Sequence, residues 1–136
     1  MTAAVERQVL LDTSVVIEPP AAGLSSIADV VAISTVTIAE LEYGVGAASD
    51  PIGRQRRRRR LQLVIETFDI VPFDLATAAS YGMLANAVRA AGRDPRPRRL
   101  DLMIAASAER HGYSIATRNA RDLQDLRRVL DVIAVI

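Results

Sequence analysis

Short apolar runs alternate along the chain with longer segments in which apolar residues recur every three or four positions. Such short runs are typical of strands buried in a parallel sheet, and the longer periodic segments are typical of helices. The runs predict strands at residues 9–11, 30–33, 69–73 and 113–116, with a fifth inside 128–136. The periodic segments predict helices at residues 36–45, 100–110 and 120–126, with two more that follow Asp50 and Asp74. This order predicts an α/β domain whose parallel sheet is covered by helices on both faces.

Capping residues and glycines set the expected limits of these helices. Polar residues with side-chain oxygens stand at four places where a helix can start, and there they can accept hydrogen bonds from free N–H groups. These residues are Asp12, Ser34, Asp50 and Asp74. Helix ends are expected in the region of Gly44 and Gly46, at Gly92, and at His111-Gly112. The proline-containing segment 93–99 is the clearest loop in the chain.

The composition is that of one domain, residues 1–136, with half of its residues hydrophobic. The chain has no cysteine and one histidine, which excludes disulfides, thiolate zinc sites and histidine-rich metal sites. All 17 basic residues are arginine, so lysine-dependent phosphate binding and Schiff-base chemistry are excluded as well. Because no signal peptide is recognisable and no apolar stretch approaches the ~20 residues that span a membrane, we expect a soluble, cytoplasmic protein.

Four acidic residues lie where a parallel sheet gathers its ligands. Asp12 ends the first predicted strand, and Asp122 follows the fourth. Glu40 lies on the helix after the second strand, and Asp101 lies in the first turn of the helix before the fourth. Because ligands bind outside the carboxyl ends of parallel strands, all four side chains can reach one crevice.

Four neighbouring carboxylates repel one another, and a divalent cation removes that conflict. Mg²⁺ and Mn²⁺ prefer carboxylate and water oxygens, and two such ions can activate a water and stabilise the leaving oxygen of a phosphodiester. Each acid also has a structural interpretation. Asp12 and Asp122 can cap helices, Asp101 can complement a helix dipole, and Glu42 is a rival to Glu40.

The segments around these acids resemble the PIN-domain nucleases, in particular the VapC-type toxins of toxin–antitoxin pairs. The resemblance covers nearly the whole chain, and it is carried by residues 10–17, 37–41 with Gly44, 100–108, and 116–119 with Asp122. Leu123 departs from the aromatic residue that the family usually has after the fourth acid. Leucine also fills a core position, so the departure is small.

The resemblance implies a three-layer α/β/α Rossmann-like domain with a five-stranded parallel sheet. It implies a Mg²⁺- or Mn²⁺-dependent endoribonuclease that inhibits translation and growth, with Asp12, Glu40, Asp101 and Asp122 as catalytic and metal-binding residues. It also implies supporting polar residues, namely Thr13, Ser14, Thr117 and Asn119. Such toxins are homodimers neutralised by a small antitoxin that covers the crevice. The helix at residues 76–91 is apolar around much of its circumference, which suits either contacts with a partner or an ordinary buried helix.

Arginine is concentrated in two clusters that suit RNA phosphates. Arg57 and Arg60 belong to the run 56–60, and Arg96, Arg98 and Arg99 come just before Asp101. The alternative for the run is a solvated face that pairs locally with Glu66 or Asp50. His111, Glu18, Asp74 and Glu109 are interpreted as capping or surface residues.

Two other functions are open to such a sequence. A phosphotransfer enzyme of the haloacid dehalogenase type also places an aspartate after its first strand, but it needs a second aspartate two residues on, where Ser14 stands, and a lysine. An RNA-binding or regulatory PIN-like domain without catalysis usually lacks members of the acidic set, whereas all four are present here.

Overall fold

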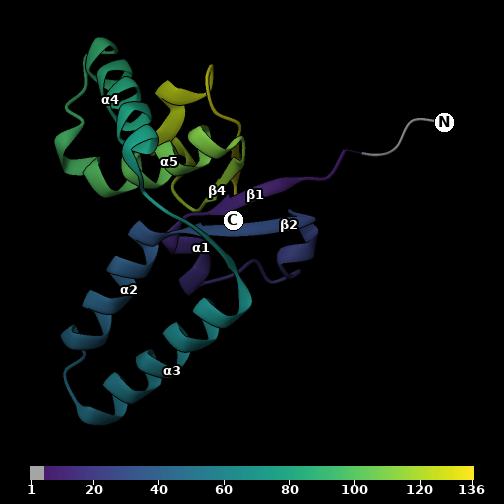
Figure 1. The fold of residues 1–136 in the computed structure, drawn as a ribbon, viewed down its shortest axis with the longest axis vertical. Coiled ribbons are helices and arrows are strands. Elements are labelled where there is room, and N and C mark those ends of the chain that lie inside the picture. The colour runs from purple at the N-terminus through teal and green to yellow at the C-terminus, as the bar shows by residue number, and fades with distance from the viewer. Residues whose placement is uncertain (1–4) are drawn as a thin grey trace.

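A five-stranded sheet lies at the centre of the computed structural model, which describes residues 5–136 (Figure 1). The strand order is β3-β2-β1-β4-β5, and every pairing is parallel. The strands are β1 (Gln8–Leu11), β2 (Val30–Ser34), β3 (Asp69–Val71), β4 (Ser114–Thr117) and β5 (Val132–Ala134). The predicted α/β fold is confirmed; residues 1–4 of the expected domain lie outside the described residues.

Helices cover both faces of this sheet. They are α1 (Thr13–Ile17), α2 (Thr35–Ala47), α3 (Pro51–Thr67), α4 (Leu75–Ala90) and α5 (Arg99–His111). Three 3₁₀ helices join them, η1 (Leu24–Ser26), η2 (Arg96–Arg98) and η3 (Ala120–Leu126). In Figure 1, α4 and α5 lie on one side of the sheet, and α2 and α3 extend from the other. No helix within residues 5–136 has the length and apolar character needed to cross a membrane.

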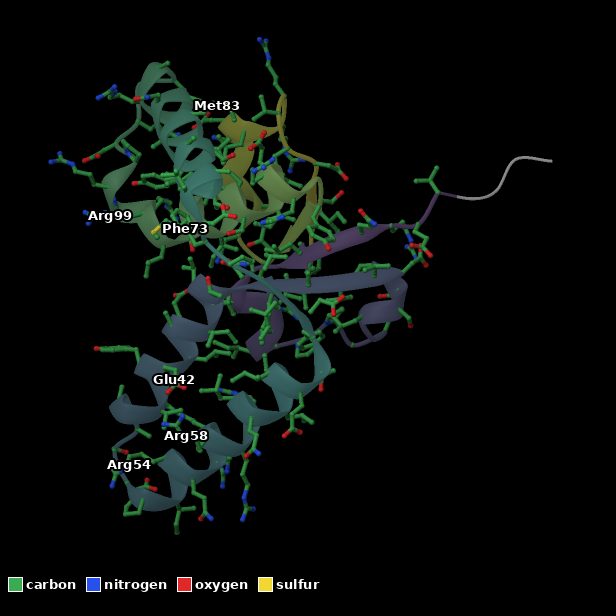
Figure 2. The ribbon with its side chains drawn as sticks, viewed as in Figure 1. Glu42, Arg54, Arg58, Phe73, Met83 and Arg99 are labelled. Atoms are coloured by element: carbon green, nitrogen blue, oxygen red, sulfur yellow. The ribbon has the colours of Figure 1, made fainter. Side chains whose placement is uncertain are left out.

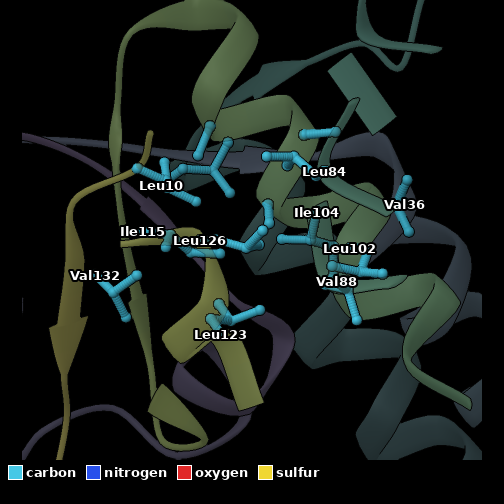
Figure 3. Packing of buried hydrophobic residues seen from close by; sticks show 14 residues of the cluster. Leu10, Val36, Leu84, Val88, Leu102, Ile104, Ile115, Leu123, Leu126 and Val132 are labelled. Atoms are coloured by element: carbon cyan, nitrogen blue, oxygen red, sulfur yellow. The ribbon is translucent and has the colours of Figure 1, made fainter. Parts of the chain in front are cut away.

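Alternate residues of the central strand feed two separate cores, because successive side chains of a strand point to opposite faces. Leu10 packs with residues of α4, α5 and η3, such as Leu84, Ile104 and Leu126 (Figure 3). Its neighbours Val9 and Leu11 pack on the other face with residues of α1, α2 and α3. The sheet is therefore buried on both faces, which explains why its strands are continuous apolar runs in the sequence.

The predicted caps are confirmed at the start of four helices. Asp12, Ser34, Asp50 and Asp74 each accept a hydrogen bond from a backbone N–H in the first turn of α1, α2, α3 and α4 respectively. Pro51 follows Asp50 at the first position of α3, where its missing N–H costs nothing. The caps at Asp12, Ser34 and Asp74 fix where the chain turns away from the carboxyl edge of the sheet, and Asp50 fixes the turn between α2 and α3.

Some predicted limits were wrong. Helix α2 continues past Gly44 and Gly46 to Ala47, because neither glycine adopts the left-handed conformation that ends a helix. Strand β3 stops at Val71 instead of residue 73, since Pro72 has no N–H for the sheet. The loop predicted at residues 93–99 is partly helical, with η2 inside it and Arg99 already in α5.

Two glycines should respond in opposite ways to alanine. Gly112 ends α5 at φ 74°, so Gly112→Ala should lower the free energy of unfolding by about 1 kcal/mol. Gly46 lies exposed within α2 with open space where an alanine Cβ would stand, so Gly46→Ala should raise it by about 0.5–1 kcal/mol. Urea unfolding of both variants measures the difference, and a destabilised Gly46→Ala would contradict the helix end described here.

Candidate active site

The four predicted acids come from four different elements and lie around one point at the carboxyl edge of the sheet. Asp12 follows β1 and is 5% exposed, and Asp122 lies in η3 after β4. Glu40 comes from α2, and Asp101 from the first turn of α5. Their proximity is expressed in the pKa of Asp101, which rises to about 6 because of burial and the negative charges of Asp12, Glu40 and Asp122. The predicted convergence of the four side chains is therefore observed.

Hydroxyl groups hold Asp12 in place. Its Oδ2 accepts hydrogen bonds from Ser14 Oγ at 2.6 Å and from Thr117 Oγ1 at 3.1 Å. The backbone N–H of Asn119 donates in turn to Thr117 Oγ1 at 3.0 Å. Ser14 lies in α1, just after β1, and Thr117 ends the neighbouring strand β4, so the two hydroxyls fix the carboxylate between the ends of β1 and β4.

Glu40 is tied to the same edge by a second pair of hydroxyls. Thr13 Oγ1 donates to Glu40 Oε1 at 2.7 Å and lies 3.0 Å from Thr37 Oγ1. Thr37 is fully buried one helical turn before Glu40, and sequence reasoning did not single it out. Thr37 lies three residues before Glu40 and therefore on the same face of α2. This spacing would have identified Thr37 from the sequence.

Asp122 has a cationic partner instead of a hydroxyl. The guanidinium of Arg98 forms an ion pair with the Asp122 carboxylate, and Arg98 lowers the pKa of Asp101 against the larger effects that raise it. The Asp122 backbone N–H donates to the carbonyl of Asn119 at 2.9 Å, which closes the first turn of η3 just after β4. Sequence reasoning placed Arg98 near the acids but did not predict this ion pair.

An open pocket of about 420 Å³ lies beside these carboxylates. It is lined by Glu40 and Asp101 together with Arg96, Pro97, Arg98, Arg99 and Leu100. The three arginines predicted before Asp101 therefore border the acidic residues. Arg57 and Arg60 line a separate groove with Arg56, Gly53 and Ile17.

Part of the arginine run joins α3 to α2. Arg58 forms an ion pair with Glu42 at 2.9 Å, and Figure 2 shows the two side chains between these helices. Arg57 Nη1 donates to the carbonyl of Gly44 at 2.6 Å. Pairing of the run with Glu66 or Asp50 is not observed among the described residues, because Glu66 accepts from Gln62 and Asp50 caps α3. Glu42 is thereby assigned to the α2–α3 contact, and Glu40 alone of the two borders the acidic pocket.

The residues interpreted as structural have structural contacts. Asp74 caps α4, and its pKa is lowered mainly by hydrogen bonds from Thr77. His111 is the last residue of α5 before the left-handed Gly112. Glu18 approaches Arg118 at 3.8 Å and is exposed.

The donor set fits a hard divalent cation. The groups that converge are carboxylates and hydroxyls, which hard divalent cations prefer, and the raised pKa of Asp101 reflects negative charge that a cation would offset. Within residues 5–136, no three acidic or histidine side chains are placed so that together they could hold a metal ion. Mg²⁺ does not require such a group, because it keeps several water ligands and binds through one or two carboxylates.

Comparison with known proteins agrees with this geometry. Residues 9–129 match the family model of the PIN domain. Ribonuclease VapC8 of Mycobacterium tuberculosis is 39% identical over 101 residues, which are 74% of this chain and 89% of that protein. The VapC ribonuclease Y4jK of Sinorhizobium fredii is 31% identical over 125 residues, covering 82% of this chain and 86% of that protein.

Solved structures resemble the fold over almost its full length. A member of the VapBC family of toxin–antitoxin systems, VapBC-5 from Mycobacterium tuberculosis, has a chain that superposes with a TM-score of 0.77 at 30% identity, covering 94% of this chain and 98% of that one. FitAcB from Neisseria gonorrhoeae gives a TM-score of 0.78 at 28% identity over 92% of this chain and 96% of that one. Sequence, fold and the grouping of acids agree, and the chain belongs to the PIN-domain family.

Proposed function

We propose that this protein is a Mg²⁺- or Mn²⁺-dependent endoribonuclease, the toxin of a toxin–antitoxin pair that inhibits translation and growth. The observation that carries the proposal is the convergence of four carboxylates beside a pocket bordered by arginines. The similar proteins named as VapC ribonucleases support the choice of RNA as substrate.

Asp12, Glu40, Asp101 and Asp122 would hold the cation. Such a cation would supply an activated water and would stabilise the charge that develops on the phosphate and the leaving oxygen. Ser14 and Thr117 keep the Asp12 carboxylate in one orientation, and Thr13 does the same for Glu40. Asn119 contributes through its backbone, which fixes Thr117. Such supporting contacts set the geometry of metal-binding carboxylates.

The arginines are assigned to RNA binding by position and charge. Arg96, Arg98 and Arg99 border the pocket of the acids, so they are placed to contact phosphates next to the cleaved bond. Arg57 and Arg60 line a groove between α1 and α3, which suits a more distant part of the strand. Contacts of this kind position an RNA without reading its bases.

The proposed partners follow from the exposed apolar surface and the related complexes. Leu75 and Met83 on α4 are 89% and 44% exposed, which suits a homodimer contact. Val36, Ala39, Tyr43 and Leu100 line an apolar groove that reaches Glu40, and an antitoxin segment lying there would cover the acids. The related solved structures include a member of the VapBC family of toxin–antitoxin systems, which supports an antitoxin as partner. From the proposed substrate and partners we infer that the protein acts in the cytoplasm.

A regulatory PIN-like domain that binds RNA without cleaving it is the alternative function. All four acids are present and converge, which favours catalysis over binding alone. The two functions differ in whether RNA is cut when a divalent cation is supplied.

Glu40 and Glu42 provide a matched pair of substitutions on one helix. Glu40→Gln should lower the rate of RNA cleavage in Mg²⁺ or Mn²⁺ at least about 100-fold, because even residues that only support metal ligands cost 10–100-fold. Glu42→Gln removes the same charge from the α2–α3 contact and should retain activity. EDTA should abolish cleavage by the wild type. Equal cleavage by wild type and Glu40→Gln would indicate a contaminating nuclease and would contradict the proposal that this protein cleaves RNA.

The pKa of Asp101 predicts a pH-dependent effect of Asp101→Asn on stability. In the metal-free protein the native pKa of about 6 lies above the ordinary 3.8, so stability falls as the pH rises between these values and the loss is complete above pH 6. After allowance for solvent screening, Asp101→Asn should raise the free energy of unfolding by about 1 kcal/mol at pH 7.5. Below pH 4 the substitution should leave the free energy of unfolding unchanged, because Asp101 is then uncharged in the native protein.

Urea unfolding of the metal-free variant and wild type at the two pH values measures this effect. Added Mg²⁺ or Mn²⁺ should stabilise the wild type more than Asp101→Asn, because the variant has lost a metal-binding charge. The variant should therefore be inactive and yet more stable than the wild type at pH 7.5. A destabilised variant at that pH would show that the four charges do not oppose folding.

A further inference from the structure

Arg98 is held in a fixed position next to the acidic residues. It ends η2 and forms the N-cap of α5, three residues before Asp101. Pro95 and Pro97 restrict the backbone on its amino-terminal side. Its side chain is about half exposed at 47%, and that of Asp122 is 23% exposed. The Arg98–Asp122 pair is therefore reachable by ions from solvent.

The four acids differ in the kind of partner that they have. Asp12 and Glu40 accept hydrogen bonds from neutral hydroxyls, and the Asp101 carboxylate has no side-chain hydrogen bond within residues 5–136. Asp122 is the member of the set with an ion pair among the described residues. Arg98 also borders both the open pocket with Glu40 and Asp101 and a small pocket with Asp122. One guanidinium thus supplies positive charge at the position where a cation is needed.

We propose that Arg98 is an exchangeable counter-ion, which neutralises Asp122 until a divalent cation displaces it. The inference rests on the proposed function, because it takes the four carboxylates as the cation site. A guanidinium and a metal ion compete for the negative charge of the same carboxylate, so the ion pair opposes binding of the metal by Asp122. Arg98 therefore weakens metal binding while it stabilises the metal-free protein.

Arg96 provides a matched control on the same short helix. It lines the same pocket, but its guanidinium is paired with Asp94, at 3.1 Å from Nε to Oδ1 and 3.1 Å from Nη2 to Oδ2. Arg96→Gln and Arg98→Gln remove equal charge from nearly the same place. A long-range effect of charge on metal affinity is common to both variants, whereas competition for Asp122 is lost only in Arg98→Gln.

The test is Mn²⁺ binding to the purified protein, measured by electron paramagnetic resonance of the free ion. Arg98→Gln should bind Mn²⁺ about 3- to 5-fold more tightly than Arg96→Gln, the change that corresponds to loss of a partly exposed ion pair. Arg98→Lys, which keeps the charge without the planar fork, should lie between them. It also provides the comparison if the glutamine variant does not fold.

Thermal unfolding gives a second readout that does not depend on activity. Without metal, Arg98→Gln should melt below Arg96→Gln, and saturating Mn²⁺ should raise its melting temperature by the larger amount. If wild type binds Mn²⁺ and Arg98→Gln and Arg98→Lys bind it no more tightly than Arg96→Gln, the inference fails and the proposed function stands. If wild type binds no Mn²⁺ at millimolar concentration, both fail.

Discussion

Repulsion among four carboxylates is the constraint on which the rest of this structure depends. Asp101 shows it most clearly, since burial and its three acidic neighbours raise its pKa to about 6. At neutral pH the metal-free fold therefore keeps an ionised group where ionisation is unfavourable. A protein selected for stability alone gains nothing from such a grouping, whereas a site that captures a divalent cation requires it.

The surrounding fold holds the four carboxylates close together in spite of their mutual repulsion. Two apolar cores hold the sheet from both faces, and the ends of β1 and β4 cannot move apart without disturbing them. Hydroxyls of Ser14, Thr117 and Thr13 then satisfy the carboxylate oxygens of Asp12 and Glu40 without neutralising their charge. The charge remains available for a cation, and Arg98 offsets only part of it at Asp122.

The sequence predicted the parts of this site that follow from local rules. Strand ends and caps are encoded within a few residues, so Asp12, Ser34 and Asp74 could be placed correctly, and the rule for parallel sheets brought the four acids together. Thr37 and the Arg98–Asp122 and Arg58–Glu42 pairs depend on which side chains meet across elements, and spacing within one segment does not determine that. The helix end predicted in the region of Gly44 and Gly46 was wrong because glycine permits a helix end without requiring one.

The most direct test of a cation site is a crystal of this protein grown with Mn²⁺ and measured at a wavelength where manganese scatters anomalously. We predict a peak within coordination distance of carboxylate oxygens from Asp12 and Asp101, with Glu40 and Asp122 bound directly or through water. Anomalous density found only at other surface positions, or none at saturating Mn²⁺, would contradict the account.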